Sequence, residues 1–164
     1  MFEIDKSNGV YAKIKELGIA LPSPPDEPPA LRLIRPLGPD MLYVSGVGPN
    51  FKGQLPNEEI HGKVGGGINQ EEAYLAAQNT ALNALAVLED YLGDLNRVTE
   101  FVKLLVLVAS VPIFSNQHLV ANGASDLLIT LYGENVGKSA RSAVGVAVLP
   151  GDIPVETEMI VRYC

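Results

Sequence analysis

Arg141 and Glu156 carry opposite charges within the segment KSARSAVGVAVLPGDIPVETEMIVRY, which is rich in small and apolar residues. An arginine can bind a carboxylate through two parallel N–H donors, and a nearby carboxylate can orient a water molecule. One interpretation is therefore an anion-binding arginine with a water-positioning glutamate. The other is that Arg141 is a solvated strand-end residue and Glu156 a surface glutamate, since most such side chains are exposed. The pattern alone leaves both open.

The same segment predicts two strands, around 141–149 and 155–162, joined as a hairpin by PGDIP. Strand alternation separates small residues on one face from valines on the other, and we expect the valine face to pack against the core. Small residues beside the arginine would leave room for another backbone, as at a subunit interface, or for a small ligand. The small-residue face comprises Arg141, Ala143, Gly145 and Ala147.

Other candidate groups give weaker signals. The glycines of GGGIN lack the spacing of a phosphate-binding loop, and Ser45 in VSGVG lacks the nucleophile elbow of serine hydrolases. His61 and His118 have no metal-binding motif around them, so we expect no metal. In VSGVG we therefore expect Gly46 to expose its backbone N–H, rather than Ser45 to act as a hydrolase nucleophile. Asn122 in VANGAS is explained either by local hydrogen bonds or by a ligand contact.

The composition indicates one globular domain. The 164 residues are 47% hydrophobic, which is enough for a core. The formal net charge is −7 and the basic residues are scattered, which argues against a nucleic-acid partner. The lone cysteine, Cys164, excludes an intrachain disulfide and favours a reducing, cytoplasmic setting. No stretch has the pattern of a signal peptide or the length of a membrane span, so we expect no membrane association.

Hydrophobic periodicity predicts two long helices. The first follows Asn69, which with Glu72 has the spacing of a capping box, and it ends at Gly93. Its expected apolar stripe is Tyr74, Ala77, Ala81, Leu85, Leu88 and Leu92. The second helix spans about 115–133, and its expected inward positions are Leu119, Leu127, Leu128 and Leu131.

The remaining pattern predicts a short helix, a linker and the strands of one sheet. The helix is expected at 10–17, and the proline-rich LPSPPDEPPA after it reads as an extended linker. There are too few helices for each strand to be crossed over in parallel, so we expect an α+β fold, a mixed sheet with two helices on one face. Besides the final two strands, the expected strands lie at 40–46 and 98–110, with a short one around 60–64.

Three stretches together resemble the RidA proteins, also called YjgF or L-PSP. ARSAVGVAVLPGDIPVETEMIV has the family's order of an Ala-Arg pair, alternating small residues, Leu-Pro and a Val/Ile-Glu strand. LYVSG is similar to the family's strand ending in Ser-Gly, and VANGASDLL fits its second-helix asparagine. The resemblance runs from about Pro29 to Arg162, which makes 29–164 a RidA-like domain preceded by the helix and linker at 1–28.

The resemblance implies a chorismate-mutase-like α+β fold that assembles as a homotrimer with sites in clefts between subunits. It implies cofactor-free hydrolysis of small enamine and imine acids, such as 2-aminoacrylate and 2-iminobutanoate, to 2-keto acids and ammonia. Arg141 would bind the substrate carboxylate and Glu156 would position the attacking water. The substrate-binding residues would be Ser45, Gly46 through its backbone N–H, Asn122 and Ala143.

Departures from the family pattern motivate a second hypothesis. Deaminating members carry a tyrosine before the first strand, whereas PPALRLIRPLG has none and offers only Leu31 to Leu33. The position two after the arginine is often cysteine in the family and is Ala143 here. The alternative is a non-catalytic module that binds a small imino or keto carboxylate in the same cleft. The endoribonuclease and translation-inhibitor labels of the family form a third class, which the net charge of −7 disfavours.

Overall fold

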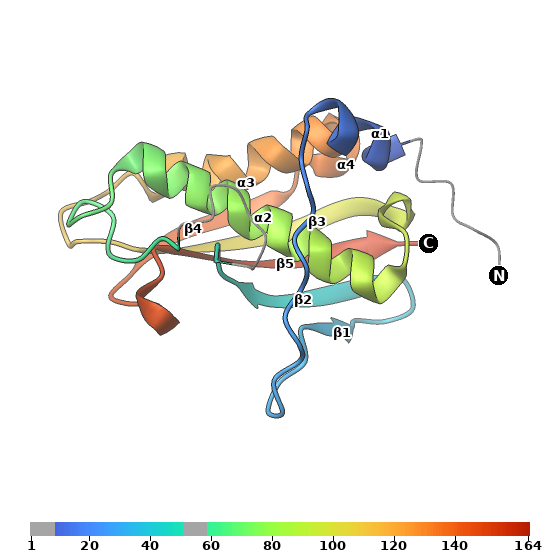
Figure 1. Cartoon of the computed structure of the whole chain (residues 1–164), viewed down its shortest axis with the longest axis horizontal. Coiled ribbons are helices and arrows are strands. Elements are labelled where there is room, and N and C mark those ends of the chain that lie inside the picture. Colours follow the sequence, from blue (N-terminus) through green and yellow to red (C-terminus); the bar gives the residue numbers. More distant parts are fainter. Residues whose placement is uncertain (1–8, 51–58) are drawn as a thin grey trace.

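The computed structural model describes residues 9–50 and 59–164 of the chain. One five-stranded mixed sheet has the order β1-β2-β5-β3-β4, and the helices lie over one of its faces (Figure 1). This confirms the predicted α+β class, with two long helices on one face of a mixed sheet. The strands are β1 (Ile34–Pro36), β2 (Met41–Val47), β3 (Val98–Ala109), β4 (Ala140–Val146) and β5 (Val155–Tyr163). The helices are α1 (Gly9–Glu16), α2 (Gln70–Leu92), α3 (Gln117–Tyr132) and α4 (Glu134–Gly137), with 3-10 turns η1 (Leu95–Arg97) and η2 (Pro150–Asp152).

Helix α2 begins and ends where the sequence predicts. The Asn69 side chain accepts a hydrogen bond from the Glu72 backbone N–H at 2.9 Å, and the Glu72 carboxylate accepts one from the Asn69 N–H at 2.8 Å. This reciprocal pair satisfies two donors at the helix start. At the other end, Gly93 has a φ of 75°, a left-handed conformation that favours glycine.

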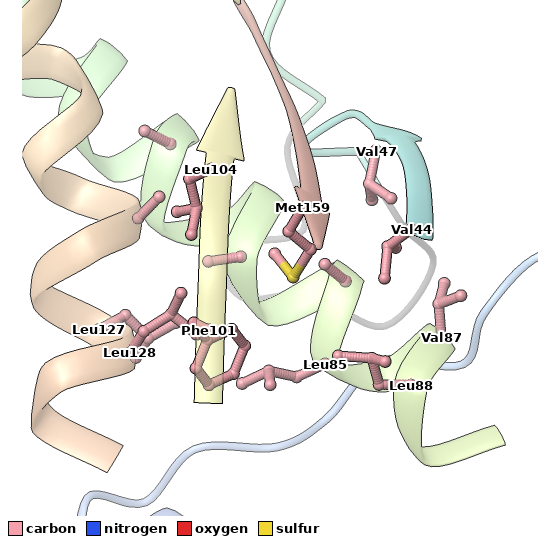
Figure 2. Close-up of a cluster of buried hydrophobic side chains, with 14 of the residues drawn as sticks. Val44, Val47, Leu85, Val87, Leu88, Phe101, Leu104, Leu127, Leu128 and Met159 are labelled. Atoms are coloured by element: carbon pink, nitrogen blue, oxygen red, sulfur yellow. The ribbon is translucent and has the colours of Figure 1, made fainter. Parts of the chain in front are cut away.

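Side chains from three strands and two helices form the core. Figure 2 shows residues of β2, β3 and β5 pointing into the layer where α2 and α3 lie. The central Phe101 and Leu104 of β3 are almost completely buried. The labelled members of this cluster are Val44, Val47, Leu85, Val87, Leu88, Phe101, Leu104, Leu127, Leu128 and Met159.

The predicted inward positions of the two long helices are confirmed with two exceptions. On α2, Tyr74 is only half-buried, and its hydroxyl donates to the Asp126 carboxylate at 2.9 Å. On α3, the prediction for Leu119 is wrong, because its side chain is 37% exposed. The buried stripe of α3 runs through Val120, Ala124 and Leu128, and the neighbouring Leu119 is rotated about 100° away from it.

The predicted hairpin between the last two strands is wrong. β4 pairs in parallel with β3 at one edge of the sheet, and β5 lies between β2 and β3, antiparallel to both. The segment from β3 through α3 to β4 is a crossover connection, which is the usual way to place two strands in parallel. β5 has four almost fully buried residues, Val155, Thr157, Met159 and Val161, and such a strand is suited to the middle of the sheet.

The expectation that the valine face of β4 packs on the core is also wrong. Arg141 lies beside Leu104 and Gly145 beside Val108, and both β3 residues are fully buried under the helices. The small-residue face of β4 therefore turns toward α3. Val144 points to the opposite side of the sheet and is 43% exposed. We call that side the open face; it carries Tyr43, Leu105, Leu107, Val144, Glu156 and Glu158.

The N-terminal segment packs onto the same body. The predicted helix is present as α1, and its Val10, Tyr11 and Ile14 belong to the main hydrophobic cluster. The proline-rich segment contains no helix or strand from 19 to 33, and it crosses the outer side of α2 before β1 begins (Figure 1). The strand predicted around 60–64 is absent, since only isolated bridges connect Val64 to neighbouring residues.

We predict that Gly123→Ala will destabilise the protein by about 3 kcal/mol, because it forces apart two closely packed helices. A β-carbon at Gly123 would lie 2.0 Å from the Tyr74 carbonyl oxygen, a backbone atom of α2. Urea unfolding checks the change in the free energy of unfolding. The control is Gly67→Ala, where a β-carbon meets nothing within 4 Å. Equal stabilities of the two variants would contradict this view of the α2–α3 contact.

Candidate active site

The side chain of Arg141 is held against a partly exposed flank of α3. One terminal nitrogen, Nη1, donates to Asn122 Oδ1 at 3.0 Å and to Ser125 Oγ at 2.9 Å. The other, Nη2, donates to the backbone carbonyl of His118 at 3.1 Å. These three acceptors come from successive turns of one helix. The guanidinium therefore has a fixed position at the seam between α3 and the edge strand β4.

This anchoring leaves part of the guanidinium available. Arginine has five N–H donors, three of which are used by the helix, so two remain for a ligand. No carboxylate within residues 9–50 and 59–164 forms an ion pair with Arg141. A half-buried cation whose charge is not neutralised is suited to bind a small anion.

Glu156 lies on β5 against a bulge of β2. At this bulge Ser45 and Gly46 together face the single residue Glu158, because the β2–β5 register shifts by one residue between Val44 and Val47. A β-carbon at Gly46 would lie only 2.3 Å from Glu156 Oε1, so the absence of a side chain there makes room for the carboxylate. Bulges often occur next to active sites, where they re-aim a side chain.

The Glu156 carboxylate is half-buried, and no side chain in the described part of the chain donates a hydrogen bond to it. Burial raises the pKa of its carboxyl group above the usual value, and the negative charge of Glu158 raises it further. A carboxylate with unused acceptor positions and an elevated pKa can hold a water molecule and accept a proton from it.

The predicted site residues form two groups within one chain. Asn122 and Ala143 lie with Arg141 on the helix side of the sheet, whereas Ser45 and Gly46 lie with Glu156 at the β2 bulge. Glu156 shares its face with Leu107, on the open face. Two strand spacings and a three-residue offset separate the Cα atoms of Arg141 and Glu156 by about 14 Å, with their side chains on opposite faces.

Two contributors to the arginine site were missed by sequence reasoning. Ser125 was not singled out, although it follows Asn122 by three residues and so lies on the same helix face. His118 contributes only its carbonyl oxygen, which no side-chain pattern can reveal. The spacing of Asn122 and Ser125 could have identified the first of these.

His61 bonds to the Gly151 carbonyl and to Glu59. Over the described parts of the chain, no three His, Cys, Asp or Glu side chains come together as a possible metal site. Nor does any helix there have the length and apolar character needed to cross a membrane.

Two proteins share much of this sequence over nearly its whole length. Protein TCP17 of Trypanosoma cruzi is 40% identical over 161 residues, which cover 95% of each chain. Atu1372 of Agrobacterium tumefaciens, a protein of unknown function, is 38% identical; its crystal structure has a TM-score of 0.85 and covers 97% of this chain and 95% of its own. No protein-family model matches the chain.

More distant structures share the fold. The Escherichia coli YjgF gene product is 23% identical with a TM-score of 0.57, over 87% of this chain and 93% of that one. E. coli TdcF, crystallised with bound serine, is 20% identical with a TM-score of 0.57, over 88% and 96% of the two chains. The chain has the YjgF fold, and it carries the Ala-Arg and Val-Glu motifs on β4 and β5. The chain belongs to the RidA (YjgF/L-PSP) family.

As a RidA protein the chain departs from the family pattern because the segment before β1 has no tyrosine and offers only Leu31 to Leu33. Leu31 is 45% exposed and Leu33 packs on the core, and the segment leads into β1. β1 and β4 are opposite edges of the sheet. Leu31 to Leu33 therefore cannot contact Arg141 of the same chain, and a contribution to its site can come only from another subunit.

We predict that Glu156→Gln will stabilise the protein more at pH 7 than at pH 4. Folding raises the pKa of Glu156, so the folded protein binds a proton at this carboxylate more readily than the unfolded chain does. The stability of the wild type therefore falls as the pH rises past the pKa values of the unfolded and folded chain. Glutamine cannot ionise, so the free energy of unfolding of the variant escapes this loss. Urea unfolding at a series of pH values measures the difference.

The matched control is Glu158→Gln, on the same strand and face. Because burial is the larger cause of the shift and the charge of Glu158 the smaller, this variant should keep most of the wild-type pH dependence. If Glu156→Gln and the wild type instead differ equally at both pH values, the elevated pKa is wrong.

Proposed function

We propose that this RidA protein hydrolyses small enamine and imine acids, of the 2-aminoacrylate and 2-iminobutanoate type, to 2-keto acids and ammonia without a cofactor. The observation that carries the proposal is the arrangement of Arg141, held by three bonds to α3 with two N–H donors unused. A planar carboxylate accepts two parallel N–H bonds from such a group. Glu156 supplies the second chemical function, an acceptor for a proton from water.

The reaction needs little beyond orientation. An enamine first tautomerises to the imine, whose C2 is already electrophilic. The oxygen of a water molecule bonds to C2 of the imine protonated on nitrogen, the C2=N π electrons move to the nitrogen, and one water proton passes to Glu156, which gives a carbinolamine. Glu156 then returns this proton to the nitrogen, the C2–N bond breaks to release ammonia, and the hydroxyl proton passes to Glu156 as the C2=O bond forms. Holding the reactants in place and stabilising charge supplies the catalysis.

The topology supports placing this site between subunits of a homotrimer. Arg141 and Glu156 of one chain are about 14 Å apart on opposite faces of the sheet, so they do not contact one substrate together. A second subunit can bring its Glu156 and Gly46 to the arginine of the first. The open face offers apolar surface for such contact, including Leu105, Leu107 and the 43% exposed Val144.

A non-catalytic carboxylate-binding module is the second candidate. The absence of a tyrosine in the segment before β1 favours it, because binding through Arg141 survives that loss more readily than turnover does. TdcF was crystallised with serine, a small carboxylate, which agrees with either candidate. Several matched proteins are named endoribonucleases. The net charge of −7 argues against RNA as the ligand here.

We predict that the wild-type protein will accelerate ammonia release when a dehydratase generates 2-aminoacrylate in the assay. Arg141→Ala should lower kcat/KM by about 100-fold through loss of charge-assisted bonds. Glu156→Gln should lower kcat by about 100-fold with little change in KM, because it removes the proton acceptor. Lys13→Ala, at an exposed cation of α1 that pairs with Glu16, is the control.

No acceleration over buffer by the wild type would reject the deaminase. If calorimetry with pyruvate then gave saturable binding that Arg141→Ala abolished, the binding module would stand in its place.

We further predict that mixed trimers will recover activity from two inactive variants. If each site takes Arg141 from one subunit and Glu156 from another, refolding Arg141→Ala and Glu156→Gln together restores about one quarter of wild-type activity at a random equal mixture. Light scattering tests whether the refolded protein is a trimer. The control replaces Glu156→Gln by the double variant, which can restore nothing. If the mixture of the two single variants is as inactive as the control mixture, Arg141 and Glu156 of one site must come from the same subunit.

A further inference from the structure

A hollow of about 390 Å³ lies between the C-terminal ends of β3 and β4 and the first turn of α3. It lies on the same side of the sheet as Arg141, because Arg141, Ala143 and Gly145 alternate along one face of β4. The proposed reaction assigns no role to it. The residues around it are Ser110, Val111, Pro112, Phe114, Gln117, Gly145, Val146 and Ala147.

Gly145 creates part of this space. A β-carbon at this position would lie 2.8 Å from Gln117 Nε2 and 3.1 Å from Ser110 Oγ. Any other residue would therefore push against both polar groups. The glycine has no positive φ and so is not required by the backbone. Its absence of a side chain leaves the Ser110 hydroxyl and the Gln117 amide facing open space.

These two polar groups are fixed, and each keeps an unused function. Gln117 Nε2 donates to the Phe114 carbonyl at 2.7 Å and to Ser110 Oγ at 3.3 Å, which sets the orientation of the amide. Among the described residues nothing donates to Gln117 Oε1, and nothing accepts the hydroxyl proton of Ser110. Ser110 is only 9% exposed, so an unused donor there is costly unless a ligand or water fills the hollow.

One acceptor and one donor, side by side, match a primary carboxamide. Its NH₂ group can donate to Gln117 Oε1, and its carbonyl oxygen can accept from the Ser110 hydroxyl. A carboxylate fits less well, because it has no donor for Gln117 Oε1 and would face that oxygen with negative charge. A branched aliphatic group of the same size would leave Gln117 Oε1 without a donor and the Ser110 hydroxyl proton without an acceptor.

The distances suit an amino-acid-sized ligand. The guanidinium of Arg141 binds at the level of Asn122, and Gln117 lies five residues earlier on α3, about 8 Å along the helix axis. An acid with a carboxamide at C4 spans about 4 Å from carboxylate carbon to amide carbon, and the polar contacts at its ends add about 3 Å each. The length of such a molecule matches this axial separation, and Ala143 lies between Arg141 and Gly145 on the same face of β4.

We propose that the Ser110–Gln117–Gly145 hollow is a side-chain subsite that selects 2-imino acids with a terminal carboxamide, of the size formed from asparagine. The proposal rests on the deaminase function for the reaction, but the subsite itself is a matter of binding. Arg141 binds the carboxylate at one end of the substrate, and the hollow binds the carboxamide at the other end. Small imines would still bind through Arg141 without filling it.

Asparagine and leucine provide the test, because their side chains have nearly the same shape and differ in polarity. A broad-specificity amino-acid oxidase with catalase generates each imine, and ammonia release is followed. The wild type should process the asparagine-derived imine with kcat/KM at least 10-fold above that of the leucine-derived imine. Gln117→Leu should abolish this preference. Gly145→Val should lower the kcat/KM for the asparagine-derived imine, relative to that for 2-aminoacrylate, at least 10-fold. Gly67→Ala should leave this ratio unchanged.

The outcomes separate the subsite from the reaction. Turnover of all three imines with equal kcat/KM for the asparagine and leucine forms overturns the subsite and leaves the deaminase standing. No turnover of any imine rejects the deaminase, and calorimetry with 2-oxosuccinamate and 4-methyl-2-oxopentanoate then decides the subsite. Tighter binding of the amide, lost in Gln117→Leu, supports it, whereas equal or undetectable binding of both overturns it. Circular dichroism establishes that each variant is folded, and Ser110→Ala repeats the test if Gln117→Leu is not.

Discussion

The contact between the edge strand β4 and α3 is the constraint on which the rest of the site depends. β4 presents its smallest residues to the helix, and Arg141 reaches across to three acceptors on successive turns of α3. A long cation would normally sample many conformations at a strand edge. Three bonds to one rigid helix remove that freedom, so that the two remaining N–H donors have a defined direction before any ligand binds. Preorganisation of this kind lowers the entropic cost of binding a small anion.

Sheet topology then determines what one chain can and cannot provide. The crossover through α3 places β4 parallel to β3, and β5 returns on the other side of β3. Glu156 is thereby separated from Arg141 by the intervening strand β3, and the two side chains lie on opposite faces of the sheet. The β2 bulge at Ser45 and Gly46 gives the carboxylate its space, again away from the arginine. A complete site in which both charges meet one substrate requires a second copy of the chain, and the partly exposed apolar side chains of the open face are consistent with such a partner.

Sequence reasoning succeeded where structure is local and failed where it depends on neighbours distant in the chain. The capping box at Asn69 and the glycine at 93 set the limits of α2 through contacts within a few residues. The pairing of β4 depends instead on which strand lies next to it, and alternation along one strand carries no information about that. The valines of β4 were assigned to the core for the same reason: alternation shows that two faces differ, but not which one a helix covers. The short β1 gave no usable pattern over its three residues.

The site residues show the same division. Arg141 was recognisable because an uncharged run of small and apolar residues, 143–150, follows it, and the family resemblance supplied the roles of Arg141 and Glu156. Their separation within one chain was not recognisable. The error about the valine face had a further consequence, since it hid the reason for the small residues beside Arg141. Ala143 packs against the core, whereas Gly145 is exposed, and the groups that its β-carbon would meet are the ends of two polar side chains and not helix backbone. Space that packing does not explain, bordered by a buried hydroxyl with an unused donor, is the kind of space that a ligand fills.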